Sequence, residues 1–471
     1  MPQENILRFK NWSGGLSDSV YRGIEGSFAK GTGLDIHSEP GLLKVNQKLK
    51  KDSGTIVLDL VKFQVKASDG NNYFFGDTGK IYKRTVEGVW STPQVNANGG
   101  CLGAEEHKDY IYYASATKLG RFGPLSGSPT WTDSWATFLN GNTVSHFMLK
   151  SEKHDELFIC DGKDIACVDD TSTFLNTVLD LKETYVAKFL IPYDINILIG
   201  ADNGRKTRLF WWDGVDVTWM DDKIFSQTPI QLLMDAESYI MMQLGNYGKF
   251  YYFDGSNKGD LKQIPGSYSK TKTLKIHSGA ADLFQGHPFF GISNKEGNPA
   301  LQGVYSWRRH NKNYPYVLNL EYVISQNKLA SIEIGCVKAD GDDLYVSWKD
   351  GSTYGVDIID FDNKYNGAYL ETILINPSRE WEKTFTAFPL TFRKLSAGCS
   401  LKMYTKTDYA ADWGTVLGTV NTTDAIDDGD TFRKPIPAVA IQLKIEFGTS
   451  GNNAPEVEEL DVLFILSKFL H

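Results

Sequence analysis

The sequence predicts an all-β protein: a seven-bladed β-propeller followed by a C-terminal antiparallel β-sandwich, with an extended Gly-rich N-terminal arm. Three observations predict this class. A unit of short apolar and aromatic runs recurs at intervals of about 40 to 50 residues, which is typical of propeller blades. Turn residues separate the runs, and no stretch shows the 3.6-residue periodicity of a helix. Near residue 367 the repeat gives way to longer alternating strands.

The repeats run from about Val61 to Asp360. The seven units begin near Val61, Gly100, Val144, Val186, Ile230, Ala281 and Ser331. The first reads VKFQVKA, SDGNN, YFFG, DTG and KIYKRT. Asp, Asn and Gly tolerate the positive φ of tight hairpin turns, so the strands of one unit should be antiparallel. The sixth and seventh units are longer, and the insertion SNKEGNPA interrupts the sixth.

These patterns divide the chain into residues 1–58, 59–366 and 367–471. The first part has clustered glycines, as in NWSGGLSD, and too few apolar residues to fill a core of its own. We expect it to be an extended arm that closes or braces the ring. The middle part is the predicted propeller.

The last part is predicted to be a sandwich. Ala440, Gln442, Lys444 and Glu446 alternate with Ile441, Leu443, Ile445 and Phe447. Strict alternation gives a strand one buried and one wet face, as in a two-sheet sandwich of roughly 100 residues. We expect this domain to project from the ring, to make contacts between subunits, and to be separable from a folded propeller.

Composition agrees with many short strands and turns. Aromatic residues make up 13% of the chain, and there are 44 glycines. The longest apolar segments are too short to span a bilayer, and MPQENILRFK lacks an apolar signal core, so no membrane segment is predicted. Five scattered cysteines without a CxxC pair indicate reduced core residues rather than disulfides or a zinc site. They are Cys101, Cys160, Cys167, Cys336 and Cys399.

The net charge of −9 argues against tight general binding of nucleic acid, which requires a basic surface. A mildly acidic wall would instead suit a channel through which DNA slides, because like charge keeps the duplex off the surface. SWRRHNK, from Ser306 to Lys312, is the one dense basic patch. It could contact phosphate or an acidic neighbour, or form an exposed rim.

Signals for an enzyme are weak. SWKDGSTY, from Ser347 to Tyr354, departs from the Asp box of propeller glycosidases because Asp350 and Gly351 are adjacent, as in an ordinary hairpin turn. A catalytic carboxylate pair among the 58 acidic residues stays possible from sequence, since such pairs are defined by spatial separation. We predict no enzyme, no catalytic residue and no cofactor.

Three further sets of residues were weighed as sites. The acidic loop TTDAIDDGDTF lacks the spacing of a calcium loop, and the histidines show no HxH, HxxH or HExxH motif, so no metal site is predicted. Tryptophans in the predicted strands could form a platform for a sugar, or core and interface. The residues considered are Asp424, Asp427, Asp428 and Asp430; His107, His146, His154, His277, His287 and His310; and Trp211, Trp212, Trp219 and Trp307.

Two patches carry a resemblance to a family. SEPGLLKV, from Ser38 to Val45, resembles the opening before the first blade in the nozzle, tail hub or packaged-DNA stabilisation proteins of short-tailed bacteriophages. SLKMYTKTDYAADWG followed by AIQLKIEFGTSGNNAPEVEELDVLF resembles the final domain of that family. The order of arm, propeller and sandwich matches over the whole chain, but residues match only in these patches.

The resemblance implies a structural virion protein of a bacteriophage tail, assembled in the host cytoplasm. Such proteins form a ring, usually of six copies, that extends the DNA channel below the portal and adaptor and helps to retain and then conduct packaged DNA. The implied partners are further copies of itself in a homo-hexamer, the tail adaptor, and other tail proteins or fibres, with genomic DNA passing through without tight binding. The alternative is a carbohydrate-recognising propeller, either a receptor-binding tail protein or a glycan-active enzyme.

Overall fold

The structure is a computed structural model that describes residues 4–21, 23–182, 184–236, 239–264, 274–294, 302–314, 316–326, 332–377 and 382–466. Every regular element in these ranges is a β-strand, which confirms the all-β prediction. Within the same ranges no helix is long and apolar enough to cross a membrane. Part of the insertion that interrupts the sixth repeat, and the start of the seventh repeat, lie outside the described residues.

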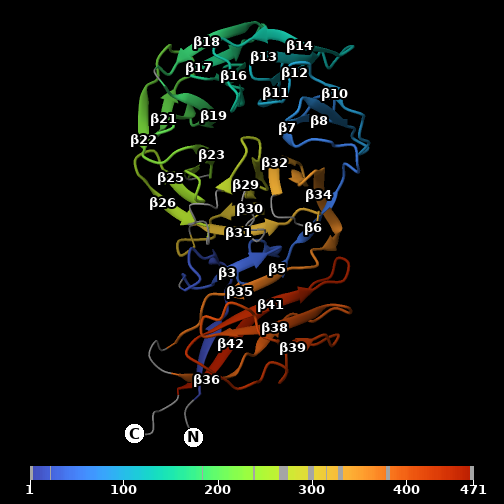
Figure 1. The fold of residues 1–471 in the computed structure, drawn as a ribbon, viewed down its shortest axis with the longest axis vertical. Coiled ribbons are helices and arrows are strands. Elements are labelled where there is room, and N and C mark those ends of the chain that lie inside the picture. Colours follow the sequence, from blue (N-terminus) through green and yellow to red (C-terminus); the bar gives the residue numbers. More distant parts are fainter. Residues whose placement is uncertain are drawn as a thin grey trace.

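A β-propeller forms the larger part of the molecule. In the described ranges, seven sheets follow one another around a central axis (Figure 1). The first is β7 (Val61–Lys66), β8 (Asn72–Gly76), β9 (Lys80–Arg84) and β10 (Gln94–Val95). The second is β11 (Gly103–His107), β12 (Tyr110–Ala114), β13 (Lys118–Gly123) and β14 (Thr130–Thr137). The third is β15 (Met148–Ser151), β16 (Glu156–Asp161), β17 (Asp164–Val168) and β18 (Phe174–Asp180).

The remaining sheets complete the circle. The fourth is β19 (Val186–Tyr193), β20 (Asn196–Asp202), β21 (Thr207–Trp212) and β22 (Asp221–Phe225). The fifth is β23 (Ile230–Asp235), β24 (Ile240–Leu244), β25 (Lys249–Phe253) and β26 (Lys258–Gln263). The sixth is β27 (Leu274–Lys275), β28 (Ala281–Phe284), β29 (His287–Asn294), β30 (Gly303–Arg308) and β31 (Val317–Tyr322). The seventh is β32 (Ile332–Asp340), β33 (Asp343–Asp350), β34 (Thr353–Lys364) and β6 (Gln47–Lys51).

The N-terminal segment supplies the outer strand of the seventh sheet. β6 runs antiparallel to β34, with Leu49 opposite Ile359 and Lys48 opposite Asp360. Leu49 is buried, and the Lys48 ammonium lies 3.3 Å from the Asp360 carboxylate. The ring is therefore closed by backbone pairing between two segments that are far apart in the sequence.

The first strands of neighbouring sheets pack closely around the axis, and glycine makes this possible. A Cβ atom on Gly335 of β32 would lie 2.1 Å from the backbone oxygen of Val61, and one on Gly103 of β11 would lie 1.8 Å from that of His146. Both distances are far inside van der Waals contact. These two positions therefore allow the backbone of one sheet to touch the backbone of the next.

Two more sheets lie below the ring in Figure 1 and contain the first and the last strands of the described residues. One has the order β1 (Asn5–Phe9), β42 (Val457–Leu466), β36 (Lys383–Ala387) and β40 (Ile436–Ala438), with β37 (Leu390–Phe392) also paired to β42. The other has the order β2 (Gly15–Leu16), β3 (Ser27–Thr32), β35 (Tyr369–Thr372), β41 (Ile441–Gly448), β38 (Ser400–Thr407) and β39 (Val416–Val420). A short ladder joins β4 (Leu34–Asp35) to β5 (Lys44–Val45). We call the two larger sheets the terminal sheets.

The terminal sheets differ from the expected separable domain. β1 pairs with β42 and β3 pairs with β35, so the first residues of the chain are strands of the same sheets as the last. β31 of the ring contacts β2, β3 and β4, and Asn319 Nδ2 donates to the Leu34 oxygen at 2.6 Å. One hydrophobic cluster runs from Trp12 through the sixth sheet to Phe464. The N-terminal segment thus belongs partly to the ring and partly to the terminal sheets, instead of forming a single arm over residues 1–58.

Candidate functional site

A cavity of about 620 Å³ opens where the first strands of the ring begin. Its walls come from six of the seven sheets, with the segments around Lys62, Cys101, Ser145, Lys188, Ile230 and His277 each contributing. Such a position, at the convergence of many elements, is where ligand sites commonly form. We call it the axial cavity.

Two lining residues of the axial cavity, Lys62 and His277, form a polar chain with Glu333, which contacts His277. Lys62 Nζ lies 2.8 Å from His277 Nδ1 and 3.3 Å from its Nε2. His277 Nε2 lies 3.2 Å from a carboxylate oxygen of Glu333, which projects from β32. An ionised carboxylate can only accept, so the imidazole hydrogen belongs on Nε2, and Nδ1 accepts a hydrogen from Lys62.

Burial and hydrogen bonding set the charge states of these three groups. Desolvation lowers the pKa of Lys62 to about 8 and that of His277 to about 4. The hydrogen bond from His277 lowers the pKa of Glu333 to about 2. At neutral pH the chain therefore holds an ionised Glu333, a neutral His277 and a Lys62 that loses its proton far more readily than an exposed lysine.

The rest of the lining combines apolar and neutral polar side chains with two further lysines and one carboxylate. Lys188 and Lys275 also face the cavity, and Lys188 Nζ lies 2.6 Å from the Asp202 carboxylate. Among the described lining residues, Asp77 is the one carboxylate, and burial raises its pKa. The described lining thus lacks the second carboxylate of a glycosidase pair.

A second polar cluster fills the seam between the ring and the N-terminal segment. His37 Nδ1 lies 3.0 Å from His310 Nε2, and His37 Nε2 lies 3.0 Å from the Ser306 hydroxyl. Glu321 of β31 is buried beside them and borders a cavity of about 600 Å³. Burial, above all, raises the pKa of Glu321 to about 7. This cluster is a structural contact between segments, with His37 and Ser306 fully enclosed.

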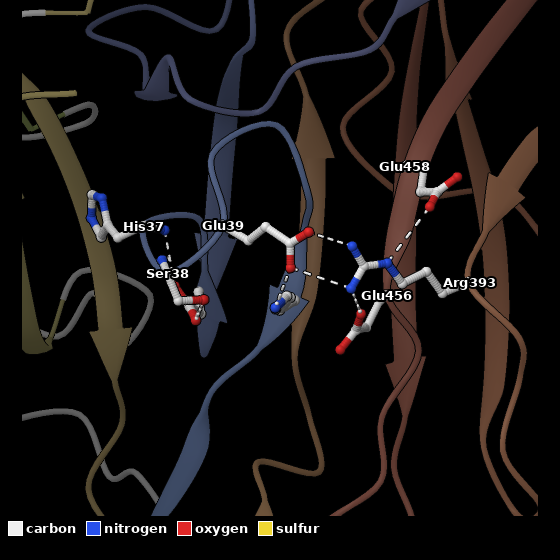
Figure 2. A network of polar contacts seen from close by, with 8 residues as sticks. His37, Ser38, Glu39, Arg393, Glu456 and Glu458 are labelled. Atoms are coloured by element: carbon white, nitrogen blue, oxygen red, sulfur yellow. Dashed lines mark hydrogen bonds and ion pairs between the residues drawn. The ribbon is translucent and has the colours of Figure 1, made fainter. Parts of the chain in front are cut away.

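The segment SEPGLLKV, from Ser38 to Val45, contacts the terminal sheets through backbone hydrogen bonds and ion pairs. Leu43 and Val457 exchange backbone hydrogen bonds of 3.0 and 2.9 Å. Figure 2 shows the Arg393 guanidinium between Glu39 on one side and Glu456 and Glu458 on the other, with Arg393 Nη1 3.2 Å from Glu39 and 3.0 Å from Glu456. Because these ion pairs are exposed, they stabilise the contact little, and the buried Leu42 and Leu43 contribute most of its stability.

Three of the histidines noted in the sequence serve packing. His146 is buried against Phe138, with ring centroids 4.0 Å apart, and its Nδ1 lies 2.7 Å from the Cys160 oxygen. His107 is buried and contacts the Asp169 oxygen at 3.4 Å, and His154 packs at the edge of Phe158. His310 belongs to the seam cluster, and His277 belongs to the axial cavity.

The four tryptophans do not form a shared platform. Trp212 and Trp307 are buried in the core, whereas Trp211 packs on Phe253 and Trp219 on Phe210 with centroid distances of 5.0 and 5.1 Å.

The acidic loop and the DG sequence have local roles. Asp428 is buried and accepts from the Leu390 and Phe432 amides, while Asp424 and Asp430 lie 3.1 and 3.2 Å from Lys394 and Arg433. Asp427 accepts from the Gly429 amide. Asp350 pairs with Thr353 across the turn between β33 and β34, where Gly351 has φ of 62°. No group of three potential metal ligands occurs in the part of the chain that the structure describes.

The basic patch is partly buried, and the cysteines lie in the core. Of SWRRHNK, Ser306 and Trp307 are buried, Arg308 borders the seam cavity, and Arg309 and Lys312 are exposed. All five cysteines are free and buried, as predicted.

Sequence reasoning missed Lys62 and Glu333. Lys62 and His277 are 215 positions apart, and His277 and Glu333 are 56 apart, in three different repeats. A lysine in an apolar run that begins a blade is the one signal that could have drawn attention to Lys62.

Comparison with known proteins finds distant similarity to solved structures only. No family model and no curated protein sequence matches this chain. Among solved structures, the C-terminal WD40 domain of Sif2 is similar with 12% identity and a TM-score of 0.44, over 67% of this chain and 99% of that one. The Dos1 propeller matches with 12% identity and a TM-score of 0.46, over 71% of this chain and 83% of that one. Hydrazine synthase of Kuenenia stuttgartiensis matches with 9% identity and a TM-score of 0.44, over 64% of this chain and 97% of that one.

Proposed function

We propose that this protein is a structural component of a bacteriophage tail that assembles side by side with further copies of itself into a ring around the DNA path. In this proposal the seven sheets are seven blades, the terminal sheets form a sandwich, and six copies make the ring. The chain acts through shape and subunit contacts, without turnover of a substrate.

The observation that carries the proposal is the contrast between the covered and the open sides of the propeller. β31 is covered by the N-terminal segment, and residues before β3 reach β26, where Lys262 Nζ donates to the Leu16 oxygen at 3.0 Å. In the described structure, β10, β14, β18 and β22 pair on one side only and form the remaining rim. Open strand edges readily pair with another chain unless they are covered.

Exposed apolar side chains lie along the same rim. Val95 of β10, Leu175 of β18 and Ile224 of β22 are exposed, and Val215 and Val217 in the preceding turn are 72% and 79% exposed. These side chains belong to three different sheets, and each is available to pack against a neighbouring copy at the open strand edges. They therefore support assembly through the outer strands, with the terminal sheets on the remaining side of the ring (Figure 1).

The shape of the purified full-length protein tests the proposal. Mass measurement in solution and low-resolution imaging should reveal a closed ring of several copies with a hole wide enough for duplex DNA. A stable monomer at micromolar and higher concentrations would contradict the assembly role. Specific retention of that monomer on immobilised glycans would favour the carbohydrate-recognising alternative instead.

A further inference from the structure

The axial cavity contains an arrangement that a ring-forming role does not require. We propose that Lys62, His277 and Glu333 form a site that covalently captures a small carbonyl compound carrying an anionic group. Lys62 is the nucleophile, His277 is its base, and Glu333 is a positioning residue.

The geometry is that of an activated nucleophile. In such sites a nucleophile lies within hydrogen-bond reach of a base, and a third group orients the base. Here the distances are 2.8 Å from Lys62 Nζ to His277 Nδ1 and 3.2 Å from His277 Nε2 to Glu333. His277 is buried, and Glu333 holds its tautomer, so the acceptor nitrogen stays directed at the amine.

The capture step balances without any added reagent. The lone pair of neutral Lys62 Nζ attacks the carbonyl carbon, and the π electrons of the carbonyl bond move to its oxygen. His277 Nδ1 takes a proton from the nitrogen and passes it to that oxygen. A second proton from the nitrogen follows, the carbon–oxygen bond breaks, and water leaves as the carbon–nitrogen double bond forms.

The cavity walls favour an anionic compound. Lys188 and Lys275 face the same space as Lys62, against the single lining carboxylate Asp77. Lys188 is already paired with Asp202, so Lys275, on the exposed side of β27, is the cation best placed to meet a phosphate or carboxylate. A carbonyl compound with such a group would be held at both ends.

Lys262 serves as a control that distinguishes reactivity caused by the His277 and Glu333 neighbours from reactivity caused by burial alone. Desolvation lowers the pKa of Lys262 to about 8, as it does for Lys62. Lys262 Nζ, however, donates to the oxygens of Gly14 and Leu16 and lies outside the axial cavity. The charged groups that act on Lys62 are Lys275 and Lys349, which lower its pKa, and Asp77 and Glu333, which raise it.

The test treats the full-length protein with pyridoxal 5′-phosphate, reduces the product with borohydride and maps the labelled peptides. About one tenth of Lys62 is neutral at pH 7, against less than about one thousandth of an ordinary lysine. We expect labelling to concentrate on Lys62, with the rate rising to a plateau above pH 8. Labelling that spreads over exposed lysines, or reaches Lys262 as fast as Lys62, would overturn the proposal.

Two comparisons sharpen the result. Loss of the Glu333 charge lowers the pKa of Lys62 further, so an electrostatic role alone predicts that E333Q labels faster. A positioning role predicts that E333Q is labelled about tenfold more slowly above pH 9 and that E333D recovers the rate. An unchanged or faster rate in E333Q would refute the positioning role.

Pyridoxal without phosphate should react with Lys62 more slowly than pyridoxal 5′-phosphate, and equal rates would refute the anionic requirement. Circular dichroism of each variant confirms that it is folded.

Discussion

At the scale of single residues, two carboxyls show how position decides charge. Glu333 is partly exposed and bonded to His277, and its pKa falls to about 2. Glu321 is enclosed in the seam, where burial and the charge of Asp35 raise its pKa to about 7 although Arg308 opposes them. The same functional group is thus ionised in one place and half protonated at neutral pH in the other.

Glu321 should make the stability of the protein depend on pH. Because its pKa is raised in the folded state, the folded protein binds more protons than the unfolded chain between the ordinary carboxyl pKa and about 7. The free energy of unfolding should therefore fall as pH rises through this window, by about 3 kcal/mol for a shift of this size. E321Q should remove that slope and be the more stable protein above pH 7.

Urea unfolding at pH 5, 7 and 9 measures the effect as the difference between E321Q and the unaltered protein. E152Q, at an exposed position, serves as the matched control and should leave the pH dependence unchanged. A difference between E321Q and the unaltered protein that stays constant across pH would contradict an elevated pKa.

At the scale of strands and sheets, contact between first strands depends on glycine. G335A would place a methyl group 2.1 Å from the Val61 oxygen, and neither backbone can move without shifting its sheet. We expect a loss of about 1–3 kcal/mol in the free energy of unfolding, as for other overpacked cores. G127A is the control, because its nearest contact would be an ordinary 3.5 Å. Equal stability of the two variants, measured by urea unfolding, would show that the sheets have room to adjust.

Local patterns predicted many of these elements, and partners far along the chain account for the rest. In β41, Ile441, Leu443, Ile445 and Phe447 are buried as the alternation predicts, but Gln442 and, just before the strand, Ala440 of the expected wet face are buried as well. The run VKFQVKA matches β7. Period-two alternation marks a strand but says nothing about which strand it pairs with. For this reason the sequence did not predict the pairing of β6 with β34 or that of β1 with β42.

At the scale of the whole molecule, the shared core changes what a truncation should do. Deleting residues 367–471 removes β42, the partner of β1, and β35, one of the two partners of β3, together with much of the cluster to which the fully buried Phe28 and Leu34 belong. We now expect the remaining chain to lose its fixed structure around the sixth sheet, contrary to the expectation of a separable propeller.

Limited proteolysis and near-ultraviolet circular dichroism of the truncated chain measure this. Residues 367–471 supplied as a second chain should restore protection if the loss arises from missing strand partners. A truncated chain as protected as the full-length protein would mean that the ring is independent after all.

The electrostatic field of the whole molecule governs how it would meet DNA. With 49 basic and 58 acidic residues, the formal charge is −9, and Lys44 and Arg393 are paired with carboxylates. A duplex gains free energy from a protein surface mainly through counterions released by unpaired cations. We therefore expect weak or undetectable binding of purified protein to duplex DNA at both 50 and 200 mM salt. A protein that makes many phosphate contacts would instead lose about 10³- to 10⁵-fold in affinity between these two salt concentrations. Anisotropy titrations measure this, with R309A and K312A as variants of the exposed basic patch. Tight binding with a steep salt dependence that these variants weaken would mean that the patch holds phosphate, and a channel in which DNA slides freely would be the wrong description.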